Sequence, residues 1–254
     1  MITREQMLYE AGSMESLPEA ISSLQEVTID GIFYINPDGA EDRRRHMEAQ
    51  SVITDVKFTR MRGPYYSKET LQKTFSECLN RQHWGTVNCG LGHLRVMNQA
   101  YDMGLSTICI LEDDVYLKQN FKAELLECVR QLNEHDPDWL ICNLADPDPR
   151  RDTETFIPRR GSVTDYLIHG GEVWGCGGYL LSRKGMEHFK DQYMTPDAVV
   201  PIDCKTYHTM DGSYAWKIHR PRTEQVVLYH QLDTDNRVIA ENSFFFGSIR
   251  SNGM

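Results

Sequence analysis

Residues 91–115, LGHLRVMNQAYDMGLSTICILEDDV, carry clear signals of secondary structure. The apolar residues of this stretch recur at steps of three and four over residues 91–105, which predicts an α-helix with one apolar face. Gly104 is placed to end that helix. Residues 107–111, TICIL, are short and apolar, as expected for a strand that is buried on both faces of a parallel sheet. The stretch therefore predicts a helix, a buried strand and, at the end of that strand, the carboxylate triplet Glu112-Asp113-Asp114.

Further strand and helix signals alternate on both sides of this stretch. We expect strands at residues 27–35, 52–60 and 139–144, and helices at residues 40–51, 67–81 and 120–132. This alternation predicts an α/β domain whose central, mostly parallel sheet is flanked by helices.

The second half of the chain is less regular. We expect strands at residues 163–168, 173–181 and 226–230, which would add a few antiparallel strands to the sheet, and a helix capped by Ser182 that runs to about Tyr193. No Pro/Gly/Ser-rich linker divides the chain. We therefore expect a lead-in over residues 1–26 with a helix at 17–24, a single domain over 27–236 and a tail over 237–254.

Composition and charge exclude several classes of protein. The 254 residues contain 27 Lys and Arg against 37 Asp and Glu, which gives a net charge of −10. This excess of acid argues against a general nucleic-acid binder. No apolar run approaches the roughly 20 residues that a membrane span needs. The seven cysteines include no CxxC pair, and acidic residues interrupt the N-terminal segment. We therefore expect a soluble cytoplasmic protein.

The carboxylate triplet is the first candidate site. Carboxylates at the end of a buried strand repel one another in surroundings of low dielectric, and a divalent cation removes that cost. Ligands bind at the carboxyl ends of strands in open α/β sheets. Oxygen ligands suit Mg²⁺ or Mn²⁺, which commonly bridge carboxylates to phosphates. The alternative is a solvated acidic loop or a helix start.

Three segments in order resemble glycosyltransferase family 25. FYIN and DRRRHM within residues 32–47 are similar to the family's first strand and its Asp-Arg-Arg cluster. Residues 89–115 are similar to its Cys-x-x-Ser-His helix and Glu-Asp-Asp strand, although Gly92 stands where Ser is usual. Residues 177–189, GGYLLSRKGMEHF, resemble its Ser-Arg-x-Gly segment and precede Pro201-Ile202-Asp203.

This resemblance implies a GT-A type fold and a metal-dependent transfer of a hexose, similar to galactose, from a UDP-sugar to a hydroxyl of a glycan or glycoprotein acceptor. It implies Mn²⁺ or Mg²⁺ as the cofactor, with Asp114, Glu112 and His230 as metal ligands. The expected donor-binding residues are Tyr34, Asn36, Arg43, Arg44, Glu112 and Asp113. Guanidinium groups bind phosphate in a bidentate manner, but at least one of Arg43, Arg44 and Arg45 is expected to lie on a solvated face. Tyr34 could equally be ordinary sheet packing.

Asp203 is the candidate general base, because transfer with inversion needs a carboxylate that takes the proton of the acceptor hydroxyl. Asp146 and Asp148 compete for this role, and Asp203 could instead be a helix-start carboxylate.

His93 is expected to support the site. The pairs Cys89/His93 and Cys204/His208 share an i, i+4 spacing and could together form a zinc site, although buried free cysteines are common. Two other functions remain open. One is a nucleotidyltransferase with a similar acidic metal site, and the other is a non-catalytic module that binds a sugar or nucleotide.

Overall fold

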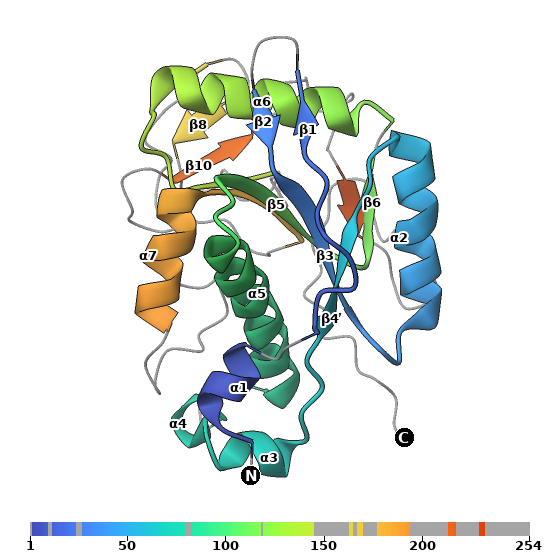
Figure 1. Cartoon of the computed structure of the whole chain (residues 1–254), viewed down its shortest axis with the longest axis vertical. Coiled ribbons are helices and arrows are strands. Elements are labelled where there is room, and N and C mark those ends of the chain that lie inside the picture. Colours follow the sequence, from blue (N-terminus) through green and yellow to red (C-terminus); the bar gives the residue numbers. More distant parts are fainter. Residues whose placement is uncertain are drawn as a thin grey trace, which may run out of the picture.

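The computed structural model describes residues 2–9, 12–23, 27–79, 83–117, 119–144, 163–164, 167–169, 177–193, 213–216 and 229–231. Its centre is a seven-stranded sheet with the order β4-β3-β5-β9-β7-β10-β8 (Figure 1). In that order the strands are Thr59–Gly63, Gly31–Pro37, Thr107–Glu112, Gly178–Ser182, Ile141–Asn143, Ser213–Trp216 and Leu167–His169.

The strand directions confirm the predicted α/β class. β4 and β5 both pair with β3 in parallel, and β10 pairs with β7 in parallel. β9 runs antiparallel to both of its neighbours, β5 and β7, and β8 runs antiparallel to β10 at the edge. The antiparallel strands therefore do not only extend the sheet at its edge, because β9 lies in its interior.

Helices cover both faces of the sheet. α2 (Glu41–Thr54) and α6 (Phe121–His135) contribute to the apolar cluster on one face, together with the β3 and β5 side chains of Ile32, Tyr34 and Leu111. α5 (Trp84–Asp102) and α7 (Arg183–Tyr193) contribute to the cluster on the other face. Figure 1 shows α5 and α7 side by side on this second face. The sheet is therefore the middle layer between two pairs of helices.

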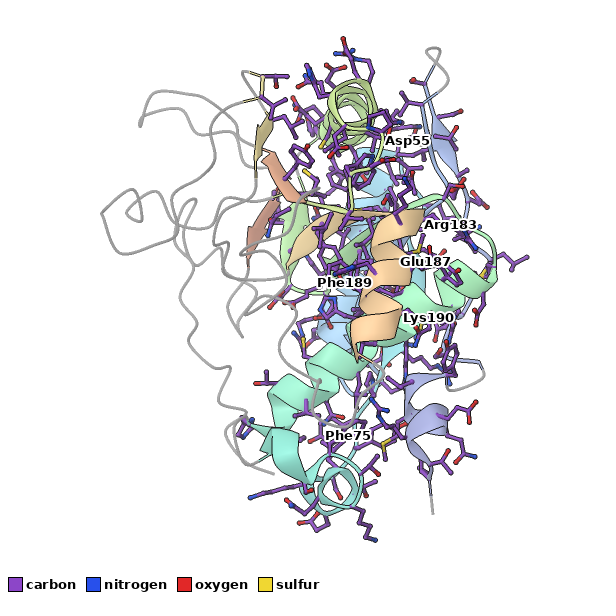
Figure 2. The ribbon with its side chains drawn as sticks, turned by 90° about the vertical axis from the view of Figure 1, so that its left-hand side faces the viewer. Asp55, Phe75, Arg183, Glu187, Phe189 and Lys190 are labelled. Atoms are coloured by element: carbon purple, nitrogen blue, oxygen red, sulfur yellow. The ribbon has the colours of Figure 1, made fainter. Side chains whose placement is uncertain are left out.

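Contacts with Tyr101 help to fix α7 against α5. The Arg183 guanidinium lies 4.2 Å, and the Lys190 ammonium 4.5 Å, from the centroid of the Tyr101 ring. Figure 2 shows both basic residues along α7. The predicted cap of this helix is confirmed, because the Gly185 amide donates to the Ser182 hydroxyl at 3.1 Å.

Most of residues 91–115 has the predicted secondary structure. α5 includes residues 91–102 but begins earlier, at Trp84, and β5 coincides with the predicted buried strand. Gly104 follows the helix with φ +79°, a conformation that glycine adopts without strain. α6 and β7 also lie within a few residues of their predicted positions.

The strand predicted at residues 52–60 is wrong in its first half. α2 ends at Thr54, and its C-cap residue Asp55 has a φ of +51°. β4 begins only at Thr59. Val52 and Ile53 are exposed on the last turn of α2. Their β-branched side chains favour a strand, but the β-propensity of an exposed pair carries little weight without a position in the sheet.

The helix predicted at residues 67–81 is two short helices, α3 (Lys68–Gln72) and α4 (Ser76–Leu79). The Ser67 hydroxyl caps α3 by accepting from the Thr70 amide at 3.3 Å. The lead-in helix predicted at residues 17–24 is also wrong, because β1 (Ile21–Ser22) pairs there with β2 (Thr28–Ile29).

Among the described residues before residue 27, a helix forms at α1 (Arg4–Leu8), whose Met7 and Leu8 are buried in the same cluster as α5. A separate two-stranded sheet joins β6 (Val115–Leu117) to β11 (Tyr229–Gln231). In the part of the chain that the structure describes, none of the helices has the length and apolar character of a membrane span.

Candidate functional site

The site begins where β3 and β5 end. These strands are parallel neighbours, with Ile35 opposite Glu112, so the residues that follow meet at one edge of the sheet. Asn36 is completely buried at this edge, and its side-chain amide donates to Asp113 Oδ2 at 2.6 Å and to the Ala40 carbonyl at 3.1 Å. Asn36 therefore fixes both the acidic turn and the start of the segment that leads into α2.

Arg43, in the first turns of α2, supplies a positive charge to the acidic turn. Its Nη1 lies 2.8 Å from Asp113 Oδ1 and 3.9 Å from Asp114 Oδ2. Both carboxylates are almost fully buried, whereas 31% of the Arg43 side chain is exposed. The guanidinium therefore stands between two buried acids and solvent.

Arg60 is a part of the site that sequence reasoning missed. It lies on β4, is 5% exposed, and donates to Asn36 Oδ1 at 2.8 Å and to Asp38 Oδ1 at 2.9 Å. It also forms an ion pair with Glu15. An arginine in the strand TRMRG, which pairs with the strand that contains Asn36, was the available signal.

Burial perturbs the ionisation of Asp113 in the acidic turn. Burial raises the pKa of Asp113, and the Arg43 charge and the Asn36 hydrogen bond offset only part of that rise. Asp113 and Asp114 thus both lie beside the Arg43 guanidinium in surroundings of low dielectric, where charge interactions are strong. Their oxygen atoms are the ligand type that Mg²⁺ and Mn²⁺ prefer, so the residues fit the divalent cation predicted from the sequence.

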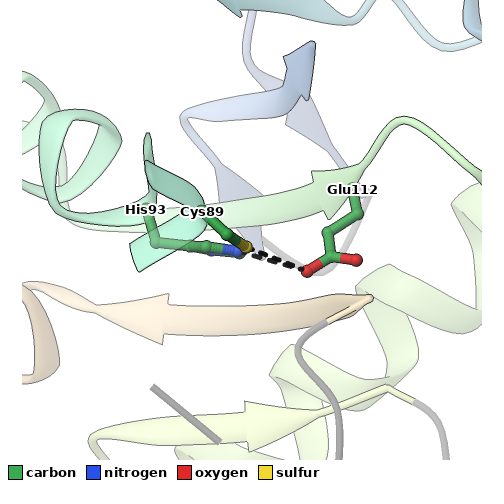
Figure 3. Close-up of side chains that lie close together, drawn as sticks. All are labelled: Cys89, His93 and Glu112. Carbon is green, nitrogen blue, oxygen red and sulfur yellow. Dashed lines mark hydrogen bonds and ion pairs between the residues drawn. The ribbon is translucent and has the colours of Figure 1, made fainter. Parts of the chain in front are cut away.

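Glu112 faces the opposite side of the sheet from Asp113. Successive side chains of a strand alternate between faces, so Glu112 points towards α5. Its Oε1 accepts from Cys89 Sγ at 3.7 Å and lies 3.5 Å from His93 Nε2 (Figure 3). Burial raises the pKa of Glu112, but the proximity of His93 and Cys89 outweighs burial and lowers this pKa below its usual value. The triplet is therefore divided between two clusters.

Gly92 allows α5 to lie close to β3 beside this second cluster. A Cβ atom at Gly92 would stand 2.9 Å from Ile35 Cγ2 and 3.3 Å from Pro64 Cδ. A serine at this position would have to displace the β-branched Ile35 side chain.

The remaining predicted donor-binding residues lie apart from the acidic turn. Tyr34 packs in the core, and burial raises its pKa to about 12. Arg44 contacts Glu48 at 3.0 Å and Glu15 at 3.5 Å. Arg45 pairs with Asp42 on the exposed side of α2, as expected for a solvated face. Of the three arginines, Arg43 is the one that the structure brings to Asp113 and Asp114.

His230 approaches this edge through its backbone. β11 pairs with β6, which follows the acidic turn directly, and His230 is opposite Tyr116. The other candidates lie outside the described residues: Asp146, Asp148, Asp203, Cys204 and His208.

Comparison with known proteins adds independent information. The family model of glycosyltransferase family 25 (LPS biosynthesis protein) matches residues 29–206. The lacto-N-neotetraose biosynthesis glycosyltransferase LgtB of Neisseria meningitidis serogroup B is 30% identical over 124 residues, which are 45% of this chain and 43% of LgtB. The procollagen galactosyltransferase 1 of Danio rerio is 24% identical over 104 residues, which are 41% of this chain and 17% of that protein. The matched part is thus less than half the length of each relative.

A solved glycosyltransferase involved in glycosylation of the major capsid of PBCV-1 aligns with 69% of this chain and 70% of its own, at 13% identity and a TM-score of 0.35. The assignment therefore rests on the sequence family, whose model matches well over half of the chain and includes the segments that build both clusters. On that match, this chain belongs to glycosyltransferase family 25.

Proposed function

We propose that the protein transfers a hexose, similar to galactose, from a UDP-sugar to a hydroxyl of a glycan or glycoprotein acceptor, with Mn²⁺ or Mg²⁺ as cofactor. The observation that carries the proposal is the cluster of Asp113, Asp114, Arg43 and Asn36 where β3 and β5 end. Ligands of open α/β sheets bind at such strand ends.

The donor diphosphate is the part of the substrate that this cluster suits. Asp113 and Asp114 would hold the divalent cation, and His230, whose strand pairs with β6, is a candidate third ligand. Arg43 is partly exposed and can turn a guanidinium N–H towards a phosphate oxygen while it stays close to Asp113. The bound cation supplies stabilisation of the charge that develops on the departing diphosphate.

Asn36 and Arg60 position this machinery without contact with the donor. Asn36 holds Asp113 through one hydrogen bond, and Arg60 holds the Asn36 amide through another. Both are buried, so the carboxylate orientation is set before a ligand arrives. Arg44 is engaged by Glu15 and Glu48, and we propose that it stabilises the fold instead of binding phosphate.

Asp203 remains the proposed base that takes the proton of the acceptor hydroxyl. Asp203→Asn should keep donor affinity and lose about 10²–10⁴-fold in transfer rate, because an amide cannot accept the proton. The product should have the inverted anomeric configuration relative to an α-linked donor. Transfer at the parental rate, or retention of configuration, would move the role to Asp146 or Asp148.

The direct experiment incubates the protein with a panel of nucleotide sugars and Mn²⁺ and measures the nucleotide released. We expect UDP from one UDP-hexose, abolished by Asp114→Asn and unaffected by Asp42→Asn, whose carboxylate pairs with the exposed Arg45. Pyrophosphate in place of UDP would indicate the nucleotidyltransferase alternative. Nucleotide binding without any release, tested with a range of acceptors, would indicate a non-catalytic module.

A further inference from the structure

We propose that Cys89, His93 and Glu112 form a second metal site, which binds Zn²⁺ or a similar transition-metal cation. Cys89 and His93 lie one turn apart on α5, and Glu112 ends β5. Their ligand atoms all lie within 4.8 Å of one another (Figure 3). The contacts that form this site have no role in the proposed transfer reaction.

The separations between these atoms suit a tetrahedral ion. Zinc bonds of about 2.3 Å to sulfur and about 2.0–2.1 Å to nitrogen or oxygen, at tetrahedral angles, place neighbouring ligand atoms about 3.3–3.6 Å apart. Glu112 Oε1 is 3.5 Å from His93 Nε2 and 3.7 Å from Cys89 Sγ. An ion could therefore be bound with only small movements of the side chains.

The His93 ring supplies a second, independent observation. The residue is 1% exposed, and its buried Nε2 lies 3.5 Å from Glu112 Oε1 but makes no well-formed hydrogen bond within the described residues. Its Nδ1 lies 2.8 Å from the Tyr179 hydroxyl. When Nδ1 carries the ring proton and donates to Tyr179, the Nε2 lone pair faces the Glu112 carboxylate. A bound cation would interact favourably with both the His93 Nε2 lone pair and the Glu112 carboxylate. The hydrogen bond between His93 Nδ1 and Tyr179 is of the kind that usually supports a metal-binding histidine.

The ligand chemistry selects the metal. Thiolate and imidazole favour Zn²⁺ over Mg²⁺ and Mn²⁺, which prefer oxygen ligands. Cys89 is exposed, so the ion can reach the site from solvent, and its thiol proton passes to solvent when the metal–sulfur bond forms. Water can occupy the fourth position.

This site keeps the Cys89/His93 pair of the sequence hypothesis and adds Glu112 from a distant strand. Cys204 and His208 lie outside the described residues. Because Glu112 and Asp113 point to opposite faces of the sheet, the acidic turn and the second site need not compete for one ion.

The test measures Zn²⁺ binding by the purified chain with a competing chromogenic chelator, and Co²⁺ binding by absorption. We expect one tight Zn²⁺ site and a sulfur-to-cobalt charge-transfer band. Cys89→Ser should abolish the band, and both Cys89→Ser and His93→Gln should weaken Zn²⁺ binding by at least about tenfold. Tyr179→Phe keeps the ring and should cost about 10–100-fold through loss of the supporting hydrogen bond. His135→Gln, at an exposed histidine, is the matched control.

The outcomes separate this proposal from the proposed function. Asp113→Asn should keep Zn²⁺ affinity and lose Mn²⁺-dependent donor binding. Equal Zn²⁺ affinity of Cys89→Ser and the parent overturns the second site, and so does absence of the cobalt band in the parent. Because Cys89 is exposed, its substitution leaves the core packing intact, so misfolding would not obscure the result. Loss of Zn²⁺ binding in Asp113→Asn would instead place the ion at the acidic turn.

Discussion

Asn36→Ala removes the side chain that connects the acidic turn to β4. The Asn36 amide donates to Asp113 and accepts from Arg60, so both charged partners lose a buried hydrogen bond at once. Hydrogen bonds to charged groups contribute about 1.5–3 kcal/mol each. The two bonds sum to about 3–6 kcal/mol, and water can refill part of the space. We therefore expect a loss of about 3 kcal/mol in the free energy of unfolding.

The same substitution changes the pH dependence of stability. The folded-state pKa of Asp113 is already raised above 3.8, mainly by burial, so the folded chain keeps this proton at pH values where the unfolded chain has lost it. Stability from this group is thus greatest at low pH and falls as the pH rises through that interval. Without Asn36 the pKa of Asp113 rises further, and the fall extends to higher pH.

Urea unfolding followed by circular dichroism measures both effects. Asn120→Ala is the control, because Asn120 is exposed, forms no capping bond and donates to Glu124 at 3.1 Å. We expect it to change stability by less than about 0.5 kcal/mol. If Asn36→Ala is as stable as the Asn120→Ala control, the buried bridge between Asp113 and Arg60 does not contribute as described.

Three further predictions concern neighbouring parts of the fold. Arg43→Ala should weaken UDP binding in calorimetry by about tenfold or more, whereas the exposed Arg45→Ala should not; equal affinities would remove Arg43 from the donor site. Gly185→Ala places a Cβ atom 2.1 Å from the Leu140 carbonyl oxygen, so thermal unfolding should show a loss of about 1–3 kcal/mol, and an unchanged midpoint would contradict this close approach. Burial raises the pKa of Glu15, but its arginine partners outweigh that effect and lower it from 4.5, so its stabilisation is present above that pH and is lost on acidification. Acid unfolding of Glu15→Gln should therefore be less steep than that of the parent, and identical curves would refute the assignment.

The local elements were predictable where local chemistry decides them. The apolar periodicity of α5, the glycine after it, the TICIL strand and the Ser182 cap all depend on neighbouring residues. The β-branched residues Val52 and Ile53 led to a wrong strand prediction, because tertiary position decides where α2 ends and their β-propensity does not. The interior place of β9 depends on pairing with two strands that are distant in the sequence, which no local pattern encodes.

The candidate site was predictable in composition but not in arrangement. The triplet Glu112-Asp113-Asp114 and the basic segment after β3 could be identified from their residue types and the family resemblance. The division of the triplet between two clusters follows from strand alternation, which turns Glu112 away from Asp113. Arg60 depended on the register between β3 and β4, so its bridge to Asn36 became visible only in three dimensions.

Asp113 and Asp114 are proposed to bind a divalent cation that holds a nucleoside diphosphate. Calorimetric titration of UDP with and without Mn²⁺, in the parent chain and in Asp114→Asn, tests this role. We expect Mn²⁺ to strengthen UDP binding in the parent and to have no such effect in the variant, while both remain folded. UDP affinity that is independent of Mn²⁺ in the parent, or enhanced equally by Mn²⁺ in the variant, would contradict it.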